Sequence, residues 1–188
     1  MREHRHSLAR FTAGKAVLNG FAYTGTLSVV AARAGARSVT TVDLSSGVLG
    51  WARDNFRLSG LDPMAPAFAF EASDAGRFLD EASRAGRLFD VILLDPPAFS
   101  AARGATFAID RDYPELIARA CRLLTEGGLL WLACNARTSP LLPLAEEGFR
   151  RARRQATLLE TGGLPPDHPT VPAQPEDRYL QVGLFRPE

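Results

Sequence analysis

Three aspartates of this sequence follow apolar segments of strand length, and they are the first candidates for a ligand site. Asp43, Asp74 and Asp95 each stand at the point where such a segment would end. A carboxylate in this position can accept hydrogen bonds from the hydroxyls of a sugar or from an amino group. The alternative for Asp43 and Asp74 is a purely structural role at the cap of the helix that follows.

Asp95 is the most informative of the three because Pro96 and Pro97 follow it directly and Phe99 comes two residues later. Two consecutive prolines fix the backbone and remove hydrogen-bond donors, which leaves carbonyl oxygens free to face a ligand. An aromatic ring at Phe99 could stack on a base. We therefore assign Asp95, Pro96, Pro97 and Phe99 to a candidate catalytic site, with a simple turn as the alternative.

The first apolar segment runs into a loop whose composition restricts the kind of ligand it can hold. The loop reads Asn19-Gly20-Phe21-Ala22-Tyr23-Thr24-Gly25. The pyrophosphate-binding pattern G-x-G-x-x-G needs glycines for a tight turn against a helix N-terminus, and here Asn19 and Phe21 occupy its first positions. A bulkier loop can still enclose a ligand that carries no phosphate, which favours S-adenosylmethionine (SAM) over NAD.

The elements that must position these residues alternate between strand and helix. The expected strands are Lys15–Asn19, Ser38–Asp43, Ala67–Glu71, Phe89–Asp95 and Leu129–Cys134. The expected helices are Gly25–Ala34, Ser46–Ser59, Ala75–Ala85, Tyr113–Leu124 and Leu142–Arg154. Near-continuous apolar strands in this rhythm are typical of a doubly wound parallel sheet covered on both faces. Because ligands bind at the carboxyl ends of such strands, Asp43 and Asp95 are expected to share one crevice.

The end of the chain has a different character. Gly162–Pro175 contains five prolines and predicts a long loop, and Tyr179–Phe185 predicts a final strand that closes the sheet as part of a β-hairpin. We expect one α/β domain over residues 1–188, with a Rossmann-like, seven-stranded, mostly parallel sheet whose last strand is antiparallel. Residues 1–14 are interpreted as an N-terminal helix or a truncated linker, and residues 162–188 as the loop and closing strand. The abrupt polar start suggests a fragment, or a chain that has lost a substrate-binding domain.

Composition restricts the function further. The 22 Lys and Arg side chains nearly balance the 21 Asp and Glu side chains, and the formal net charge is only +1. The domain therefore lacks the charge excess of an autonomous nucleic-acid binder, although a separate domain could supply that affinity.

Cys121 and Cys134 fit neither a disulfide framework nor a metal site, since no other Cys or His lies two to four residues from either. Without a signal peptide or membrane segment, a cytoplasmic protein with no metal is expected.

Taken together, these motifs resemble the catalytic half of the large-subunit ribosomal RNA methyltransferases, which are class I SAM-dependent enzymes. The cytosine-5 and guanine-N7 branches are the most similar. The resemblance extends from about Leu18 onward. It rests on Val17–Gly25, Val42–Ser45, Ala52–Asn55, Asp95–Pro97 with Phe99-Ser100, Arg111–Tyr113, Gly127-Gly128, Asp167–Pro169, Pro175-Glu176 and Tyr179-Leu180.

The resemblance implies a role for each matching residue. Asp43 would bind the ribose of SAM, Asp74 its adenine, and Asp95 its amino-acid end or the incoming base. The rest of the SAM pocket would consist of Asn19, Phe21, Tyr23, Thr24, Gly25, Leu44 and Asn55, although a helical asparagine is most often simply solvated. The substrate partner would be RNA, and ribosomal RNA in particular. Since members of that family carry an RNA-binding module upstream of the matching part, the mode of target recognition stays open.

Cys134 decides which atom of a base could be methylated. Methylation at C5 of a pyrimidine needs a thiolate that adds at C6, and Cys134 lies at the end of the fifth strand, in the expected region. The cytosine-5 branch usually has Ser-Cys-Ser one residue later, however, where this chain has Asn135. Cys134 is therefore either the nucleophile or a small buried residue that fills the strand. Without a nucleophile, transfer to a ring nitrogen needs only alignment and desolvation of the acceptor.

Two weaker signals have equally simple explanations. The arginines of Arg150–Arg154 could contact phosphates or form a solvated helix end. His168 could line the acceptor pocket or have a structural role. The rival functions are a nicotinamide oxidoreductase, a non-catalytic RNA- or protein-binding module, and SAM-dependent methylation of a protein or small molecule.

Overall fold

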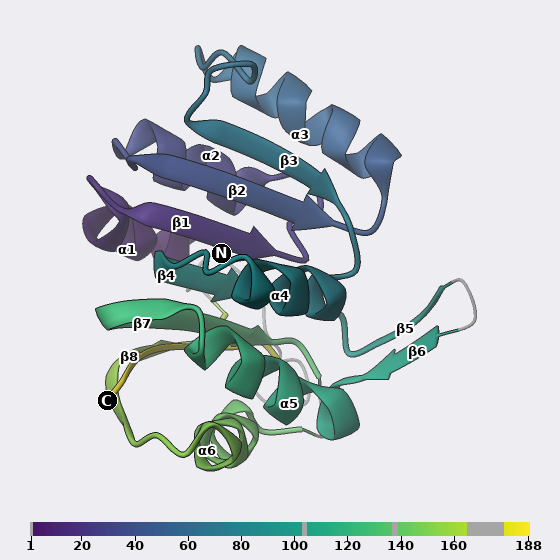
Figure 1. Cartoon of the computed structure of the whole chain (residues 1–188), viewed down its shortest axis with the longest axis vertical. Coiled ribbons are helices and arrows are strands. Elements are labelled where there is room, and N and C mark those ends of the chain that lie inside the picture. The colour runs from purple at the N-terminus through teal and green to yellow at the C-terminus, as the bar shows by residue number, and fades with distance from the viewer. Residues whose placement is uncertain (1, 103–104, 137–138, 165–178) are drawn as a thin grey trace.

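Seven strands form one sheet in the order β3-β2-β1-β4-β7-β9-β8 (Figure 1). The computed structural model describes residues 2–102, 105–136, 139–164 and 179–188. The first five strands in this order run parallel, and β9 lies antiparallel between β7 and β8. The strands are β1 Ala16–Gly20, β2 Ser38–Asp43, β3 Phe68–Ala72, β4 Phe89–Leu94, β7 Leu124–Cys134, β8 Ala156–Gly162 and β9 Gln181–Pro187. The predicted fold class, including the antiparallel last strand, is confirmed.

Helices cover both faces of the sheet because successive side chains of a buried strand point to opposite sides. Leu93 packs in one core cluster with residues of α1, α2 and α3, whereas Leu94 packs in the other with residues of α4, α5 and α6. Figure 1 shows α4, α5 and α6 in front of the sheet. The helices are α1 Arg2–Thr12, α2 Thr26–Arg33, α3 Ser46–Leu58, α4 Ala75–Arg84, α5 Ile109–Cys121 and α6 Leu141–Ala152.

A two-stranded hairpin was not predicted from the sequence. β5 (Phe99–Ala102) and β6 (Ala105–Ala108) pair with each other and not with the main sheet. The hairpin follows the strand end at Asp95 and leads directly into α5, so it projects from the edge of the sheet where β4 ends (Figure 1). With only four residues in each strand, its pattern was too short to distinguish from a loop.

Two elements begin four or five residues before their predicted starts, and α5 also ends at Cys121 instead of Leu124, whereas the other predicted bounds differ by at most two residues. α5 begins at Ile109 and not at Tyr113, because the Asp112 carboxylate accepts a hydrogen bond from the Ala108 amide (2.8 Å) and stabilises an additional first turn. β7 begins at Leu124 and not at Leu129, because Leu124 already pairs with Phe89 ahead of an irregularity in the ladder. β8, the partner of the predicted closing strand, had not been assigned a range.

The C-terminal hairpin is tied to α1. Ser7 donates a hydrogen bond to Glu160, and Arg10 forms an ion pair with the same carboxylate at 2.6 Å. His4 Nε2 lies 2.6 Å from the carbonyl oxygen of Gly163. Most of the predicted loop Gly162–Pro175, including His168, lies outside the described residues. None of the described helices is long and apolar enough to cross a membrane.

The contact between α5 and α6 depends on a glycine. A Cβ atom on Gly148 would lie 2.6 Å from both Cβ and Cγ2 of Ile117, whereas one on Gly50 in α3 would meet nothing within 4 Å. We expect Gly148→Ala to lower the free energy of unfolding by about 1–3 kcal/mol, because the two helices must move apart. Gly50→Ala should raise it by up to about 1 kcal/mol, since alanine favours a helix. Urea denaturation of both variants measures this, and equal stability would contradict the close packing.

Candidate active site

The loop between β1 and α2 adopts an unusual backbone conformation. Phe21 and Tyr23 have positive φ angles of 57° and 49°. Residues other than glycine rarely adopt this left-handed backbone conformation. The Ala22 amide donates to the Val42 carbonyl (3.0 Å), and the Gly25 amide donates to the Ala22 carbonyl (2.8 Å). Strain of this kind persists only where surrounding contacts enforce it, and it concentrates at ligand sites.

Asp43 fixes this loop from the neighbouring strand. Its Oδ2 accepts a hydrogen bond from the Tyr23 amide at 2.9 Å, and its Oδ1 accepts one from the Ser45 amide at 3.0 Å. Because an ionised carboxylate oxygen can accept two hydrogen bonds, each oxygen keeps capacity for a ligand hydroxyl. The helix cap that was the alternative for Asp43 is supplied by Ser45, whose hydroxyl accepts from the Val48 amide.

The Asp43 side of the site is completed by the loops after β2 and β3. Leu44, Ser73, Asp74 and Ala75 line the same cavity as Asp43. Asp74 also caps α4, since its Oδ1 accepts a hydrogen bond from the Arg77 amide at 2.9 Å. Asp74 is therefore both a helix cap and a cavity residue, so the two interpretations made from the sequence do not exclude each other.

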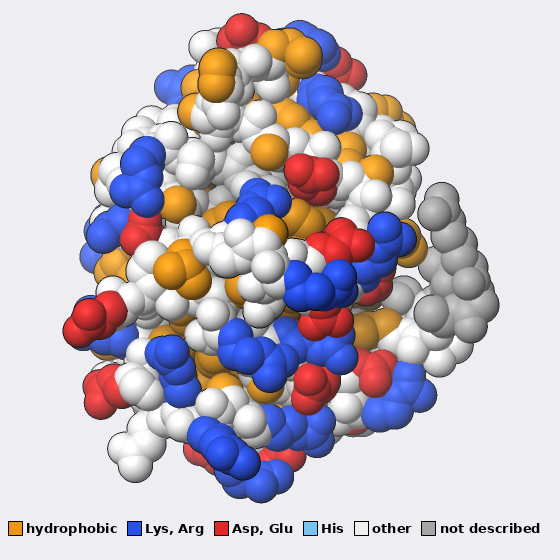
Figure 2. All heavy atoms as spheres, in the orientation of Figure 1, with side chains coloured by type: hydrophobic (Ala, Val, Ile, Leu, Met, Phe, Trp, Pro, Cys, Tyr) orange, Lys and Arg blue, Asp and Glu red, His pale blue; other side chains and the backbone are white. Residues whose placement is uncertain are grey.

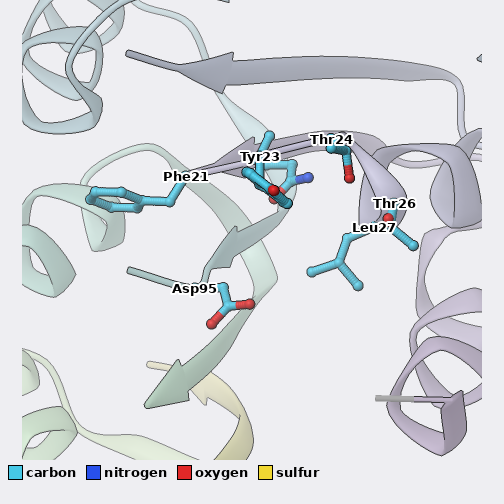
Figure 3. A pocket seen from close by; sticks show the side chains of 8 residues that line it. Phe21, Tyr23, Thr24, Thr26, Leu27 and Asp95 are labelled. Atoms are coloured by element: carbon cyan, nitrogen blue, oxygen red, sulfur yellow. The ribbon is translucent and has the colours of Figure 1, made fainter. Parts of the chain in front are cut away.

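Asp95 lies at the centre of the site. It lines the 450 Å³ cavity that contains Asp43 and also an adjoining cavity of 240 Å³ beneath the β1–α2 loop. Figure 3 shows the Asp95 carboxylate at this smaller cavity together with Tyr23, Thr24 and Leu27, while the Phe21 ring points away from them. Burial raises the pKa of Asp95 to about 6. Asp95 therefore takes up a proton at a pH about two units higher than an exposed aspartate does.

Part of the wall of the larger cavity comes from the β5–β6 hairpin and from the segments that follow β4 and β7. Pro97, Ser100, Phe107 and Asn135 line it. The rings of Phe107 and Phe21 meet with centroids 5.7 Å apart at a tilt of 50°. The parallel strands lie in the order β3-β2-β1-β4-β7. The cavity extends along their carboxyl ends from Asp74, which follows β3, to Asn135, which follows β7.

Tyr113 supports this wall from below. Its side chain is fully buried in α5, and its hydroxyl lies 2.9 Å from the Leu94 carbonyl and 3.0 Å from the Ala133 carbonyl. The hydroxyl can donate its single proton to either oxygen. These are the last carbonyls before Asp95 and Cys134, so Tyr113 joins the ends of β4 and β7 where the two strands separate.

The structure brings most of the predicted cofactor residues together. Both predicted strand-end aspartates, Asp43 and Asp95, line one cavity. The other predicted residues that line one or both cavities are Asn19, Phe21, Tyr23, Thr24, Leu44, Asp74 and Pro97. Asn19 is almost fully buried and donates to the Ser28 hydroxyl at 2.9 Å, so it also anchors the loop to α2.

Three predicted residues support the site without lining these cavities. Asn55 Nδ2 donates to the Thr24 carbonyl at 2.8 Å and so holds the loop from α3. Gly25 has a φ of 71°, and a Cβ atom there would lie 2.8 Å from Ala52 Cβ, so glycine allows α3 to approach. Pro96 is buried behind Asp95. Asn55 and Gly25 thus have positioning roles in this structure, and their direct contact with a cofactor stays a prediction.

The stacking role predicted for Phe99 is not supported by its position in the hairpin. Phe99 pairs with Ala108 across the hairpin and Ser100 pairs with Phe107, and cross-strand partners share a face. Ser100 and Phe107 line the cavity, whereas the Phe99 side chain is 64% exposed and is not among the described lining residues. The aromatic wall is therefore formed by Phe107, which sequence reasoning missed because the hairpin register was unknown.

The nucleophile role of Cys134 does not fit its position. Its thiol is fully buried in the core cluster beneath α5 and α6, and it lies 3.2 Å from the Ser139 carbonyl. Burial also raises the pKa of the thiol, which disfavours the reactive thiolate. The next residue, Asn135, lines the cavity instead. The interpretation of Cys134 as a small buried residue is the one that the packing supports.

Two of the four arginines in the run at the end of α6 form local ion pairs. Arg150 and Arg151 both form ion pairs with Glu147, at 2.7 and 2.8 Å. Arg119 on α5 similarly pairs with Asp80 and Glu115. Figure 2 shows blue and red side chains interspersed over the helices of this face, so the visible charges form no continuous basic stripe.

A comparison with known proteins identifies the class to which this fold and site belong. The family model of S-adenosylmethionine-dependent methyltransferases matches residues 1–186. The chain therefore belongs to this family, and the resemblance seen in the sequence is confirmed.

Individual relatives agree with this assignment. The chain is 37% identical over 188 residues to the ribosomal RNA large subunit methyltransferase I of Aeromonas hydrophila, covering 98% of this chain and 47% of the relative. It is 39% identical over 150 residues to the ribosomal RNA large subunit methyltransferase K of Neisseria meningitidis, covering 79% and 42%. A methyltransferase crystal structure complexed with SAH superposes with a TM-score of 0.88 at 30% identity, covering 98% and 48%. The chain thus spans about half the length of these relatives.

The residues of the cavity fit the cofactor of this family. Asp43 retains acceptor capacity for two ribose hydroxyls, and Leu44 offers an apolar surface beside Asp74 for a base. The loop after β1 presents Phe21 and Tyr23 where a phosphate-binding loop would have glycines. The half-buried Asp95 carboxylate suits an amino group as its partner. Each part of SAM therefore has a chemically matched partner along the sheet edge.

The contribution of Asp43 can be measured directly. We expect Asp43→Ala to weaken SAM binding by about 1–3 kcal/mol, because charged hydrogen bonds to the ligand and to the Tyr23 and Ser45 amides are lost together. Isothermal titration calorimetry measures the affinity. The matched control is Asp54→Ala, which removes an exposed aspartate of α3 paired only with Arg57. An Asp43→Ala protein that binds SAM like the Asp54→Ala protein would contradict the assignment.

Proposed function

We propose that this chain is the catalytic part of an enzyme that transfers a methyl group from SAM to a base of RNA, and that the RNA is large-subunit ribosomal RNA. The observation that carries the proposal is one cavity whose wall contains both the proposed cofactor residues Asp43 and Asp74 and a second set, Asp95, Pro97 and Asn135. The names of the ribosomal RNA methyltransferases that match this chain support the choice of RNA. A ribosomal substrate implies a cytoplasmic location.

The mechanism requires mainly that the acceptor be aligned and kept dry. SAM, when bound, supplies an activated methyl group on a positively charged sulfur. The chain provides a rigid frame around it: Asp43 and Asn55 hold the β1–α2 loop, and Tyr113 holds the ends of β4 and β7. Fixing two reactants in the correct orientation can by itself supply most of the rate enhancement of such a transfer.

Asp95 is the proposed catalytic residue because it is an acceptor for an amino hydrogen at the point where cofactor and base would meet. Its carboxylate can hold the amino group of the cofactor or of the base, and the Pro96-Pro97 backbone that follows cannot compete for it with amide hydrogens. Burial strengthens the hydrogen bond to its charged form but also makes that form harder to maintain. The protonation state of Asp95 should therefore control the rate.

We further propose that the methyl group goes to a nitrogen and not to C5 of a pyrimidine. Cys134, the last residue of β7, is buried in the core, and Asn135, which follows β7, lines the cavity. An amide cannot add to C6 of a pyrimidine as a thiolate does. A ring or amino nitrogen has its own lone pair, so alignment suffices.

The proposed function is tested with SAM labelled in its methyl group and deproteinised large-subunit ribosomal RNA from cells that lack the gene. We expect label to enter one base of this RNA, which mass mapping identifies. Transfer only to protein or a small molecule, or no transfer by a protein that binds SAM, would overturn it.

The acceptor atom is tested with Cys134→Ala and with Cys134→Ser, which preserves a hydrogen-bond donor to the Ser139 carbonyl. We expect both variants to keep activity within about a few-fold of the wild type, because no covalent intermediate needs the thiol. Loss of transfer in both variants, with SAM affinity intact, would indicate carbon methylation.

The pH dependence of the rate tests Asp95. With a pKa of about 6, this carboxyl is mostly protonated at pH 5 and mostly ionised at pH 7. We expect the single-turnover rate to rise about tenfold over this range, and the Asp95→Asn variant to be slow with no such rise. A wild-type profile without an inflection near pH 6 would contradict the role.

The same raised pKa predicts a pH-dependent effect on stability. The pKa in the folded state lies above the unfolded value, so ionised Asp95 destabilises the fold as pH rises from about 4 to 7. We expect the free energy of unfolding of Asp95→Asn, measured by urea denaturation at pH 7.5, to exceed that of the wild type by about 1–2 kcal/mol after allowing for partial exposure. At pH 4 the two proteins should be equally stable.

A further inference from the structure

The β5–β6 hairpin contributes an aromatic wall that the function described so far does not use. Phe107 and Ser100 form one cross-strand pair, and both line the 450 Å³ cavity that Asp95 and Asn135 also line. The Phe107 side chain is only partly buried, so part of its ring faces open space. Core packing does not explain why an aromatic ring is left partly exposed at the wall of a cavity.

The ring of Phe107 is held in place from behind. The Phe21 ring lies 5.7 Å away at a tilt of 50°, and Phe21 itself has the left-handed φ of 57° that the β1–α2 loop enforces. Both rings pack against the core cluster beneath α4, α5 and α6. The hairpin strand β6 continues directly into α5 at Ile109, which is buried in that cluster. Phe107 is therefore anchored to the rigid part of the domain.

Other residues that line the cavity with Phe107 suit the edge of a base. Asn135 offers both a donor and an acceptor, and Asp95 offers a carboxylate, while Pro97 adds apolar surface. An enzyme that modifies a base must take it out of its stack, and it then replaces the lost stacking with aromatic or apolar side chains. Stacking on an aromatic ring and hydrogen bonds to the edge are the two contacts that such a pocket provides.

Building on the proposed function, we propose that Phe107 is the residue on which the target base of the RNA stacks, with Asn135 and Asp95 reading its edge. In this arrangement the hairpin acts as a wall for the acceptor and not for the cofactor. Phe99, on the other face of the hairpin, takes no part in it. Phe107 and Phe99 therefore have different roles, and Phe107 belongs to the part of the cavity that would hold the acceptor base and not to the part that would hold the cofactor.

The test compares Phe107→Ala, Phe107→Leu and Phe107→Trp with the wild-type protein. Methyl transfer from SAM to deproteinised large-subunit ribosomal RNA gives kcat/KM, and calorimetry gives the affinity for SAM. Loss of one stacking partner should lower kcat/KM about 10- to 100-fold in Phe107→Ala. Leucine should not restore it, because it offers no π surface, whereas tryptophan should restore most of it. SAM affinity should change by less than about twofold in all three.

Two further variants serve as comparisons on the same assay. Phe99→Ala tests the residue favoured by sequence alone and is expected to keep its kcat/KM. Trp51→Ala removes another exposed aromatic ring, on α3, and controls for general effects on stability. Urea denaturation of all variants verifies that they fold.

Each result has a separate meaning. If the wild type methylates ribosomal RNA but Phe107→Ala keeps its kcat/KM, the stacking inference fails while the proposed function stands. If Phe107→Ala loses SAM affinity by the same factor as kcat/KM, the ring belongs to the cofactor half and the inference is wrong. If leucine restores the rate as well as tryptophan does, the contact is apolar filling and not stacking. If the wild type binds SAM and methylates no ribosomal RNA, the proposed function fails and the inference with it.

Discussion

The Asp43 carboxylate joins the two loops on which the cofactor half of the site depends. Its hydrogen bonds to the Tyr23 and Ser45 amides fix the loop after β1 to the loop after β2. The first of these loops contains two residues in a left-handed conformation, and without such a tie its strain would relax into other conformations. The carboxylate proposed to bind the ribose is therefore also the group that shapes the pocket around it.

The fold and much of the site could be predicted because they depend on local patterns. Buried parallel strands appear as continuous apolar segments, and their carboxyl ends meet at one sheet edge whatever the details of packing. This is why Asp43, Asp74 and Asp95 were identified from the sequence, and why the strand-end aspartates of β2 and β4 do lie in one cavity. The dual role of Asp74, as helix cap and cavity residue, follows from the same geometry.

The remaining site residues depend on register, which a single sequence does not reveal. In a strand, a shift of one residue moves a side chain from one face to the other. Cys134 and Asn135 are neighbours at the end of β7, yet the first packs in the core and the second lines the cavity. Phe99 and Phe107 pose the same problem in the hairpin, where only the pairing of Ser100 with Phe107 shows which ring faces inward. The positioning role of Asn55 was not predicted because its bond to the Thr24 carbonyl joins residues far apart in the sequence.

Several features that lower stability are concentrated at one edge of this domain. Phe21 and Tyr23 have strained backbones, Asp95 carries a charge that burial disfavours, and Phe107 leaves part of an aromatic ring unpacked. By contrast, the described part of the chain has no buried side-chain nitrogen or oxygen without a hydrogen-bond partner. Sequences that fold well keep local preferences and packing consistent, and exceptions gather where function requires them. Apart from Arg153, whose left-handed backbone ends α6, these features support the proposed active site at this edge by an argument that is independent of any relative.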